Sequence, residues 1–118
     1  MTETTEYLEL EQIDGLIKAA GKDGANEIID AFRRSTASLL DQLSDHHKAR
    51  SASEAAIVAH SVKGSAANVG AHKISKSAHE IEAACKVEDF NLIEEHIASM
   101  RDCLEATLAQ FSAHIENS

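Results

Sequence analysis

The fold and the candidate site both depend on one stretch, AHSVKGSAANVG, which runs from Ala59 to Gly70. Its apolar residues recur at helical spacing, yet Gly64 lies in the middle of the predicted helix. A glycine inside a helix costs about 0.5–1 kcal/mol relative to alanine, so we expect a local need for the missing side chain. His60 lies one turn before Gly64 on the same face, and Lys63 lies between them. The stretch therefore predicts a helix face with a chemical role, which the rest of the chain holds in place.

The composition of the chain favours an all-α protein. Its 118 residues include no proline or tryptophan, one tyrosine and three phenylalanines. Helical periodicity recurs over five ranges: 7–20, 25–44, 53–69, 72–87 and 90–115. Because short connections make successive helices antiparallel neighbours, we expect an up-and-down four-helix bundle with a short additional N-terminal helix across one end. Residues 7–118 are predicted to form a single domain, and residues 1–6 a flexible N-terminus.

The charge and the cysteines narrow the class of protein further. A formal charge of −9 argues against nucleic acid or an anionic membrane as the main partner. No apolar run approaches the roughly 20 residues that span a bilayer, and the polar, acidic N-terminus does not resemble a signal peptide. Cys85 and Cys103 lack CxxC spacing, which indicates free thiols in a reducing compartment. We therefore expect a soluble cytoplasmic protein, and we also expect it to act as a monomer.

The helix face around His60 is small and apolar. At about 100° per residue, the core side of this helix is formed by Ala55, Val58, Ala59, Val62, Ala66 and Val69. His60 points away from that side, and its neighbours on the helix surface are Ala56, Ile57, Gly64 and Ala67. A solvated helix face normally collects Glu, Lys and Gln, so this face is predicted to be a docking surface.

The residue types around His60 suit phosphoryl chemistry. A neutral imidazole nitrogen is a good nucleophile for phosphorus, and Lys63 is close enough on the helix to reach a phosphoryl oxygen. Gly64 removes the side chain that would crowd an incoming acceptor, and Ser65 is expected to hydrogen bond to nearby backbone. His60 alone would be interpreted as an ordinary surface histidine. Together with Lys63, Gly64, Ser65 and Gly70, it predicts a phosphoryl acceptor.

Residues 60–70 resemble the signature of histidine phosphotransfer (HPt) domains, H-x-[LV]-K-G-S-x-x-x-[LV]-G. The resemblance covers nearly the whole chain, and it continues in the following helix through Ile74, Ala78, Ile81 and Glu82. Lys86 falls where many members of the family carry a basic residue near the active histidine. The chain departs from the usual pattern at two positions, Val62 and Ala78, both of which affect only local packing.

The resemblance implies the function and the site. His60 would accept a phosphoryl group from an aspartyl phosphate on the receiver domain of a hybrid histidine kinase, with Lys63 supporting the charge. It would pass the group to the receiver domain of a response regulator in a multistep phosphorelay. The partner-docking residues would be Ala56, Ile57, Gly64, Ala67 and Lys86, and the structural residues Ser65, Gly70 and Glu82. The Mg²⁺ would belong to the receiver, and the chain would have no cofactor, metal site, ATP-binding site or autokinase activity of its own.

Other classes of protein fit the sequence less well or stay open. The dimerisation domain of a histidine kinase usually has an acidic residue after the histidine and a proline nearby, whereas Ser61 follows here and no proline occurs. Metal sites in bundles use Glu-x-x-His or His-x-x-x-His spacing, and neither is present. A binding-only helical module remains an alternative, as does the phospho-accepting domain of a chemotaxis-type kinase. Glu82 and Lys86 would form an i,i+4 pair, unless Lys86 instead supports the phosphoryl pocket.

Overall fold

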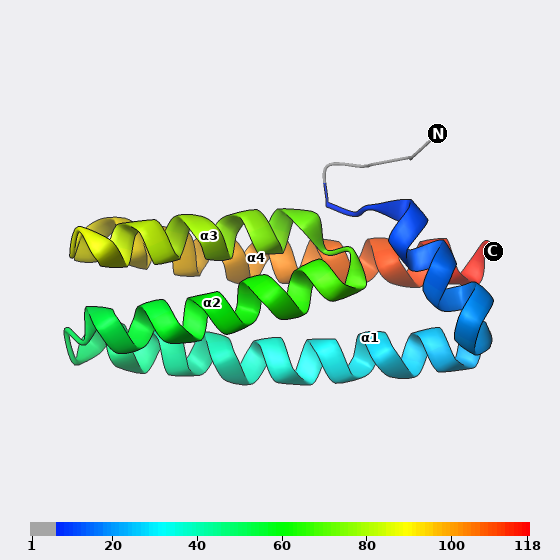
Figure 1. Cartoon of the computed structure of the whole chain (residues 1–118), viewed down its shortest axis with the longest axis horizontal. Coiled ribbons are helices and arrows are strands. Elements are labelled where there is room, and N and C mark those ends of the chain that lie inside the picture. Colours follow the sequence, from blue (N-terminus) through cyan, green and yellow to red (C-terminus); the bar gives the residue numbers. More distant parts are fainter. Residues whose placement is uncertain (1–6) are drawn as a thin grey trace.

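The computed structural model describes residues 7–118, and the predicted flexible N-terminus at 1–6 lies outside the described residues. Within the described part the chain folds into four helices: α1 (Leu10–Lys48), α2 (Ala52–Val69), α3 (His72–Lys86) and α4 (Phe90–Glu116). Consecutive helices run in opposite directions, and each packs against two neighbours to form a four-helix bundle (Figure 1). The bounds of α2, α3 and α4 agree with the predicted ranges to within one residue.

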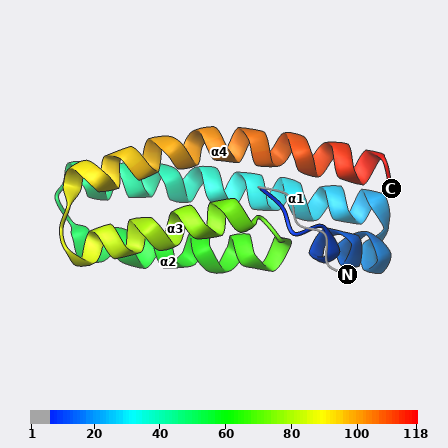
Figure 2. The ribbon, with the colours of Figure 1, turned by 90° about the horizontal axis from the view of Figure 1, so that it is seen from above.

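Helix α1 differs from the prediction in two places, at the break between the two predicted helices and at its C-terminal end. The sequence predicts two helices separated at 21–24, whereas the only non-helical backbone angles inside α1 are at Gly21 (φ 74°, ψ 174°). Helical geometry resumes at once, because one glycine in a conformation forbidden to most residues is enough to turn the chain. The segment before Gly21 crosses the end of the bundle near the C-terminus (Figures 1 and 2).

The other end of α1 is longer than predicted. Residues 45–48, predicted to be part of a polar connection, form the last turn of α1. That turn carries His46, His47 and Lys48, and basic side chains near a helix C-terminus are favoured by the helix dipole. The connection to α2 is consequently short, and one of its residues, Arg50, has a positive φ of 58°.

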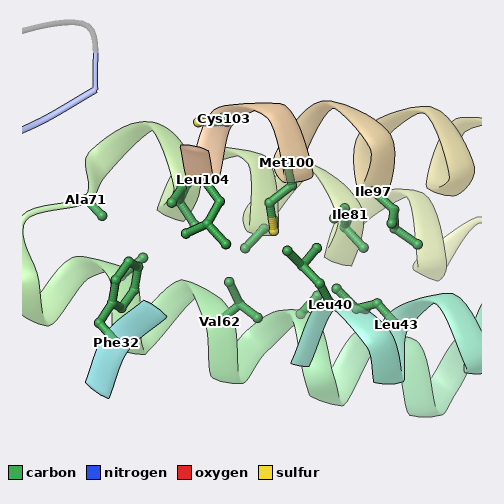
Figure 3. Close-up of a cluster of buried hydrophobic side chains, with 14 of the residues drawn as sticks. Phe32, Leu40, Leu43, Val62, Ala71, Ile81, Ile97, Met100, Cys103 and Leu104 are labelled. Carbon is green, nitrogen blue, oxygen red and sulfur yellow. The ribbon is translucent and has the colours of Figure 1, made fainter. Parts of the chain in front are cut away.

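The hydrophobic core lies along the bundle axis and takes residues from every helix (Figure 3). The predicted core side of α2 is confirmed, since all six of its residues are buried. Phe32 packs edge-on against Phe111 across α1 and α4, with ring centroids 6.3 Å apart. Cys85 and Cys103 are buried and form no disulfide within residues 7–118, as predicted for small core residues. Burial raises the pKa of the Cys85 thiol, with the charge of Glu82 adding to the effect.

Gly70 connects α2 to the crossing segment of α1. It ends α2 in the left-handed conformation (φ 78°), as predicted, and its carbonyl oxygen accepts a hydrogen bond from the Glu9 amide at 2.9 Å. Gln12 Nε2 donates to the carbonyl of Asn68 at 2.9 Å. A Cβ atom at Gly70 would lie only 2.9 Å from the Glu9 carbonyl oxygen and from Gln12 Cβ. The glycine is therefore required by both its backbone conformation and this close approach, which fixes the end of the helix that carries His60.

Candidate functional site

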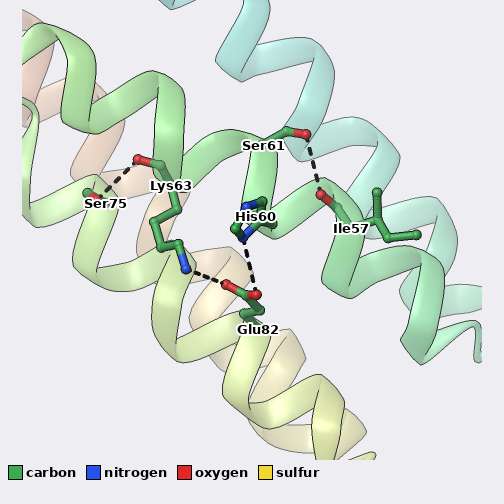
Figure 4. Close-up of polar contacts among 6 residues, drawn as sticks. All are labelled: Ile57, His60, Ser61, Lys63, Ser75 and Glu82. Carbon is green, nitrogen blue, oxygen red and sulfur yellow. Dashed lines mark hydrogen bonds and ion pairs between the residues drawn. The ribbon is translucent and has the colours of Figure 1, made fainter.

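His60 lies on the exposed side of α2, and its side chain is 68% exposed. Its orientation follows from the core pattern of α2. Ala59 and Val62 face the core, and at 100° per residue His60 then points outward. The imidazole Nδ1 lies 3.3 Å from Glu82 Oε2 on the adjacent helix α3 (Figure 4). His60 is thus exposed to a partner on one side and held by a carboxylate on the other.

Glu82 contacts both predicted catalytic residues. Its Oε1 accepts a hydrogen bond from Lys63 Nζ at 2.8 Å, while its Oε2 faces His60 (Figure 4). The Lys63 hydrogen bond is the main cause that lowers the pKa of Glu82 below its ordinary value, and the charges of Lys63 and His60 add to it against desolvation. Glu82 is therefore ionised at neutral pH, with one oxygen hydrogen-bonded to Lys63 and the other facing Nδ1 of His60.

The pairing of Glu82 corrects one expectation from the sequence. The i,i+4 spacing predicts a pair between Glu82 and Lys86, but no ion pair joins them in the described chain; Glu82 pairs with Lys63 instead. The reason is that α2 and α3 pack closely, so the carboxylate meets a lysine across the helix interface. Ser75 Oγ strengthens this interface by donating to the carbonyl of Lys63 at 3.2 Å.

The sequence contained a signal for the Glu82 contact that spacing within one helix does not reveal. Two antiparallel helices joined by a tight turn bring together residues that lie equally far from the turn. His60 lies 11 residues before Ala71, in the turn between the two helices, and Glu82 lies 11 residues after it. The hairpin register thus places Glu82 opposite His60.

The predicted docking residues lie on two sides of His60. Ala56 and Ile57 line a shallow hollow together with His60, Ser61 and Glu82. Ile57 is 67% exposed, so this hollow presents a large apolar side chain at the surface. Ala67 lies on the other side, in a groove that also includes Lys63 and Gly70.

Nothing in the described part of the chain requires position 64 to be a glycine. A Cβ atom placed on it would have no other heavy atom within 4 Å, apart from the backbone of its own helix and its chain neighbours. Its φ is not positive, so the backbone conformation does not require glycine either. The missing side chain therefore leaves free space on the outer surface of α2, one turn from His60.

Lys86 and Ser65 lie at the edges of the site. Lys86 is exposed at the end of α3, in a hollow shared with Ala56 and Arg50. Ser65 is half-buried, and its expected hydrogen bond to backbone stays a prediction. Over residues 7–118, no three His, Cys, Asp or Glu side chains are grouped as a metal site would require.

Comparisons with known proteins agree with this geometry. The family model of the Hpt domain matches residues 27–112, a range that includes His60, Lys63 and Glu82. The chain belongs to the Hpt domain family. Members of this family are phosphocarrier modules of histidine phosphotransfer rather than kinases, and they interact with receiver domains of two-component systems.

A solved structure has the same fold as this Hpt chain. The crystal structure of histidine-containing phosphotransfer protein B (HptB) from Pseudomonas aeruginosa PAO1 superposes with a TM-score of 0.86 at 19% sequence identity. The match covers 98% of this chain and 99% of that one, so the fold is shared over the full length. A search of curated protein sequences finds no match. No helix within residues 7–118 is long and apolar enough to span a membrane.

Proposed function

We propose that this Hpt chain carries a phosphoryl group on His60 between two receiver domains. The acceptor would be Nε2, because Nδ1 faces Glu82 and the imidazole is otherwise exposed. With a proton on Nδ1 donated to the ionised carboxylate, the lone pair is on Nε2, where a partner can approach. The observation that carries this proposal is the exposed His60 held by Glu82 in a chain of the Hpt family.

The transfer would be an in-line displacement. Nε2 of His60 attacks phosphorus as the bond from phosphorus to the aspartyl oxygen of the donor receiver breaks, and the aspartate leaves as a carboxylate. Glu82 holds the imidazole and stabilises the positive charge that develops on it. Lys63 can exchange its contact with Glu82 for a phosphoryl oxygen, since both are anionic acceptors within reach of one flexible side chain. The second transfer reverses these steps with a new aspartate as acceptor.

The chain itself would need no cofactor. Mg²⁺ would be bound by the acidic pocket of the receiver. The donor would be the receiver of a hybrid histidine kinase and the acceptor that of a response regulator, with this chain acting as a monomer. Because the five glycines form no phosphate-binding loop, incubation with ATP alone should leave the chain unlabelled.

The proposal is tested by incubating the chain with a receiver domain carrying labelled phosphate. The label should appear on the chain, be lost in acid, and be absent from His60→Gln. His114→Gln is the matched control, because His114 lies on α4 and pairs with Asp14 rather than with any residue of the site, and this variant should still accept the label. An acid-stable label, or full labelling of His60→Gln, would refute the proposal. Receiver binding without any label would instead indicate a binding-only module.

Labelling with ATP and a kinase domain added in trans would test the remaining alternative. If such a kinase labels His60 directly and no receiver does, the chain is the phospho-accepting domain of a chemotaxis-type kinase. Direct transfer from a phosphorylated receiver favours the phosphorelay carrier.

A further inference from the structure

A row of basic side chains runs along the exposed face of α3. It consists of His72, Lys76, His79 and Lys86, and we refer to it as the α3 stripe. At 100° per residue these four positions fall within about 80° of the helix surface, and Ala83, the only other residue in that sector, is uncharged. The stripe thus presents basic groups over four turns without an acidic residue among them.

The four side chains of the stripe are not used by the fold. None of them has a hydrogen bond, ion pair or ring contact among residues 7–118. The other histidines all have a partner: His46 with Glu54, His47 with the Phe90 carbonyl, His60 with Glu82, His96 with Glu80 and His114 with Asp14. The polar groups of the stripe are therefore available to a second molecule.

Two of the carboxylates that border the stripe are already paired, while a third, Glu88, shares a hollow with Lys86. Glu82 lies on the α2 side and is occupied by Lys63 and His60. Glu80 lies on the α4 side, and its Oε2 is 3.5 Å from His96 Nδ1. Three of the four residues of the stripe, His72, Lys76 and His79, line the groove beside Lys63, in which Glu9 is the one acidic residue. The two lysines of the stripe, Lys76 and Lys86, supply its formal positive charge, and through this groove the stripe is continuous with the site.

The charge of the whole chain makes this face distinctive. Residues 52–86, which include α2 and α3, have four lysines and three acidic residues, a formal charge of +1. Because the whole chain carries −9, the remaining residues carry −10. An acidic partner is repelled by the rest of the surface and attracted to this face, so long-range electrostatics orient it before contact.

We propose that the α3 stripe docks an acidic patch on the receiver domain and steers its aspartyl phosphate onto His60. The inference rests on the proposed function and adds to it the chemistry of the partner surface. Contact with the stripe places the partner over α3. Glu82 of α3 contacts both Lys63 and His60 of α2, so the docked partner lies next to His60. The α3 stripe acts mainly on the rate of association. Exposed charges at the edge of an interface change the association rate more than they change the stability of the complex.

The test compares Lys76→Glu with Lys18→Glu, which makes the same change in net charge at an exposed lysine on the crossing segment of α1. The probe is a beryllofluoride-activated receiver domain chosen because, when phosphorylated, it labels the wild-type chain. Stopped-flow measurement should give an association rate about three- to tenfold lower for Lys76→Glu at low salt, with the difference vanishing in high salt. Lys18→Glu should change the rate by less than about twofold.

Each result separates the two proposals. Equal rates for Lys76→Glu and Lys18→Glu, with His60 still labelled, would overturn the docking inference and leave the function intact. A selective loss of association rate, with the label mapped to a residue other than His60, would support docking and refute the phosphotransfer site. Circular dichroism verifies that both variants fold, and Lys76→Gln, which removes one charge rather than two, should show an intermediate rate.

Discussion

The substitution Gly64→Ala tests whether the fold requires glycine at position 64 or whether only partner binding requires it. Apart from its chain neighbours and the backbone of its own helix, no heavy atom lies within 4 Å of a Cβ added at Gly64, and the residue lies inside α2 without a positive φ. Adding a methyl group therefore causes no clash and gains the difference in helix propensity, about 0.5–1 kcal/mol. For a domain of this size, that gain raises the melting temperature by about 2–4 °C.

The same position should respond in the opposite way when a receiver binds. Gly64→Gln fills the space next to His60 with a long side chain, and we expect the dissociation constant for a receiver to rise at least about tenfold, equivalent to about 1.4 kcal/mol. Ala109→Gln is the matched control for added bulk, because Ala109 is exposed on α4, a helix that does not pack against α2. Its affinity for the receiver should stay at the wild-type value.

Thermal unfolding followed by circular dichroism and receiver titration by calorimetry measure the two effects. Gly15→Ala provides a control for the stability gain, because Gly15 is also helical with open space around its Cβ position. Both alanine variants should be stabilised to a similar extent. A lower melting temperature for Gly64→Ala, or unchanged affinity in Gly64→Gln, would refute our explanation of this glycine.

Three further predictions concern Lys63, Gly70 and Glu82. Lys63→Ala should slow phosphotransfer about 10- to 100-fold while the far-ultraviolet circular dichroism stays unchanged, and equal transfer rates would remove Lys63 from the mechanism. Gly70→Ala should lower the free energy of unfolding by about 1–3 kcal/mol in a denaturant titration, because the Cβ meets the Glu9 carbonyl oxygen at a positive φ. Since the pKa of Glu82 is lowered by folding, its ionisation stabilises the protein above its ordinary pKa and this contribution is lost as the pH falls through the lowered value. The stability difference between wild type and Glu82→Gln should therefore shrink between about pH 5 and pH 3 in urea titrations, and a constant difference would show that the carboxylate is not stabilised by its neighbours.

The three later helices could be predicted closely from the sequence because their signals are local. Apolar residues recur every three or four positions, and Gly70 ends α2 where a left-handed residue is needed. The extent of α1 was harder, because Gly21 turns the chain without interrupting the helix for more than one residue. A cluster of glycines at 21 and 24 predicts a loop, whereas only the first adopts a positive φ.

The features of the candidate site that depend on α2 alone could be predicted from the sequence. The contacts between α2 and α3 could not. The outward orientation of His60 and the exposure of Ile57 follow from the helical pattern of α2. The dual contact of Glu82 depends on the register between α2 and α3, which periodicity within one helix does not contain. For the same reason, the sequence offered an i,i+4 pair with Lys86 as one interpretation of Glu82, whereas in the structure Glu82 pairs with Lys63 across the interface.

The central claim is that Nε2 of His60 receives the phosphoryl group while Glu82 holds Nδ1. Long-range proton–nitrogen and phosphorus–nitrogen correlations in the nuclear magnetic resonance spectrum of the phosphorylated, ¹⁵N-labelled chain test it most directly. We predict a phosphorus coupled to Nε2 of His60 and a proton retained on Nδ1. Phosphorus on Nδ1, or on any residue other than His60, would contradict the account.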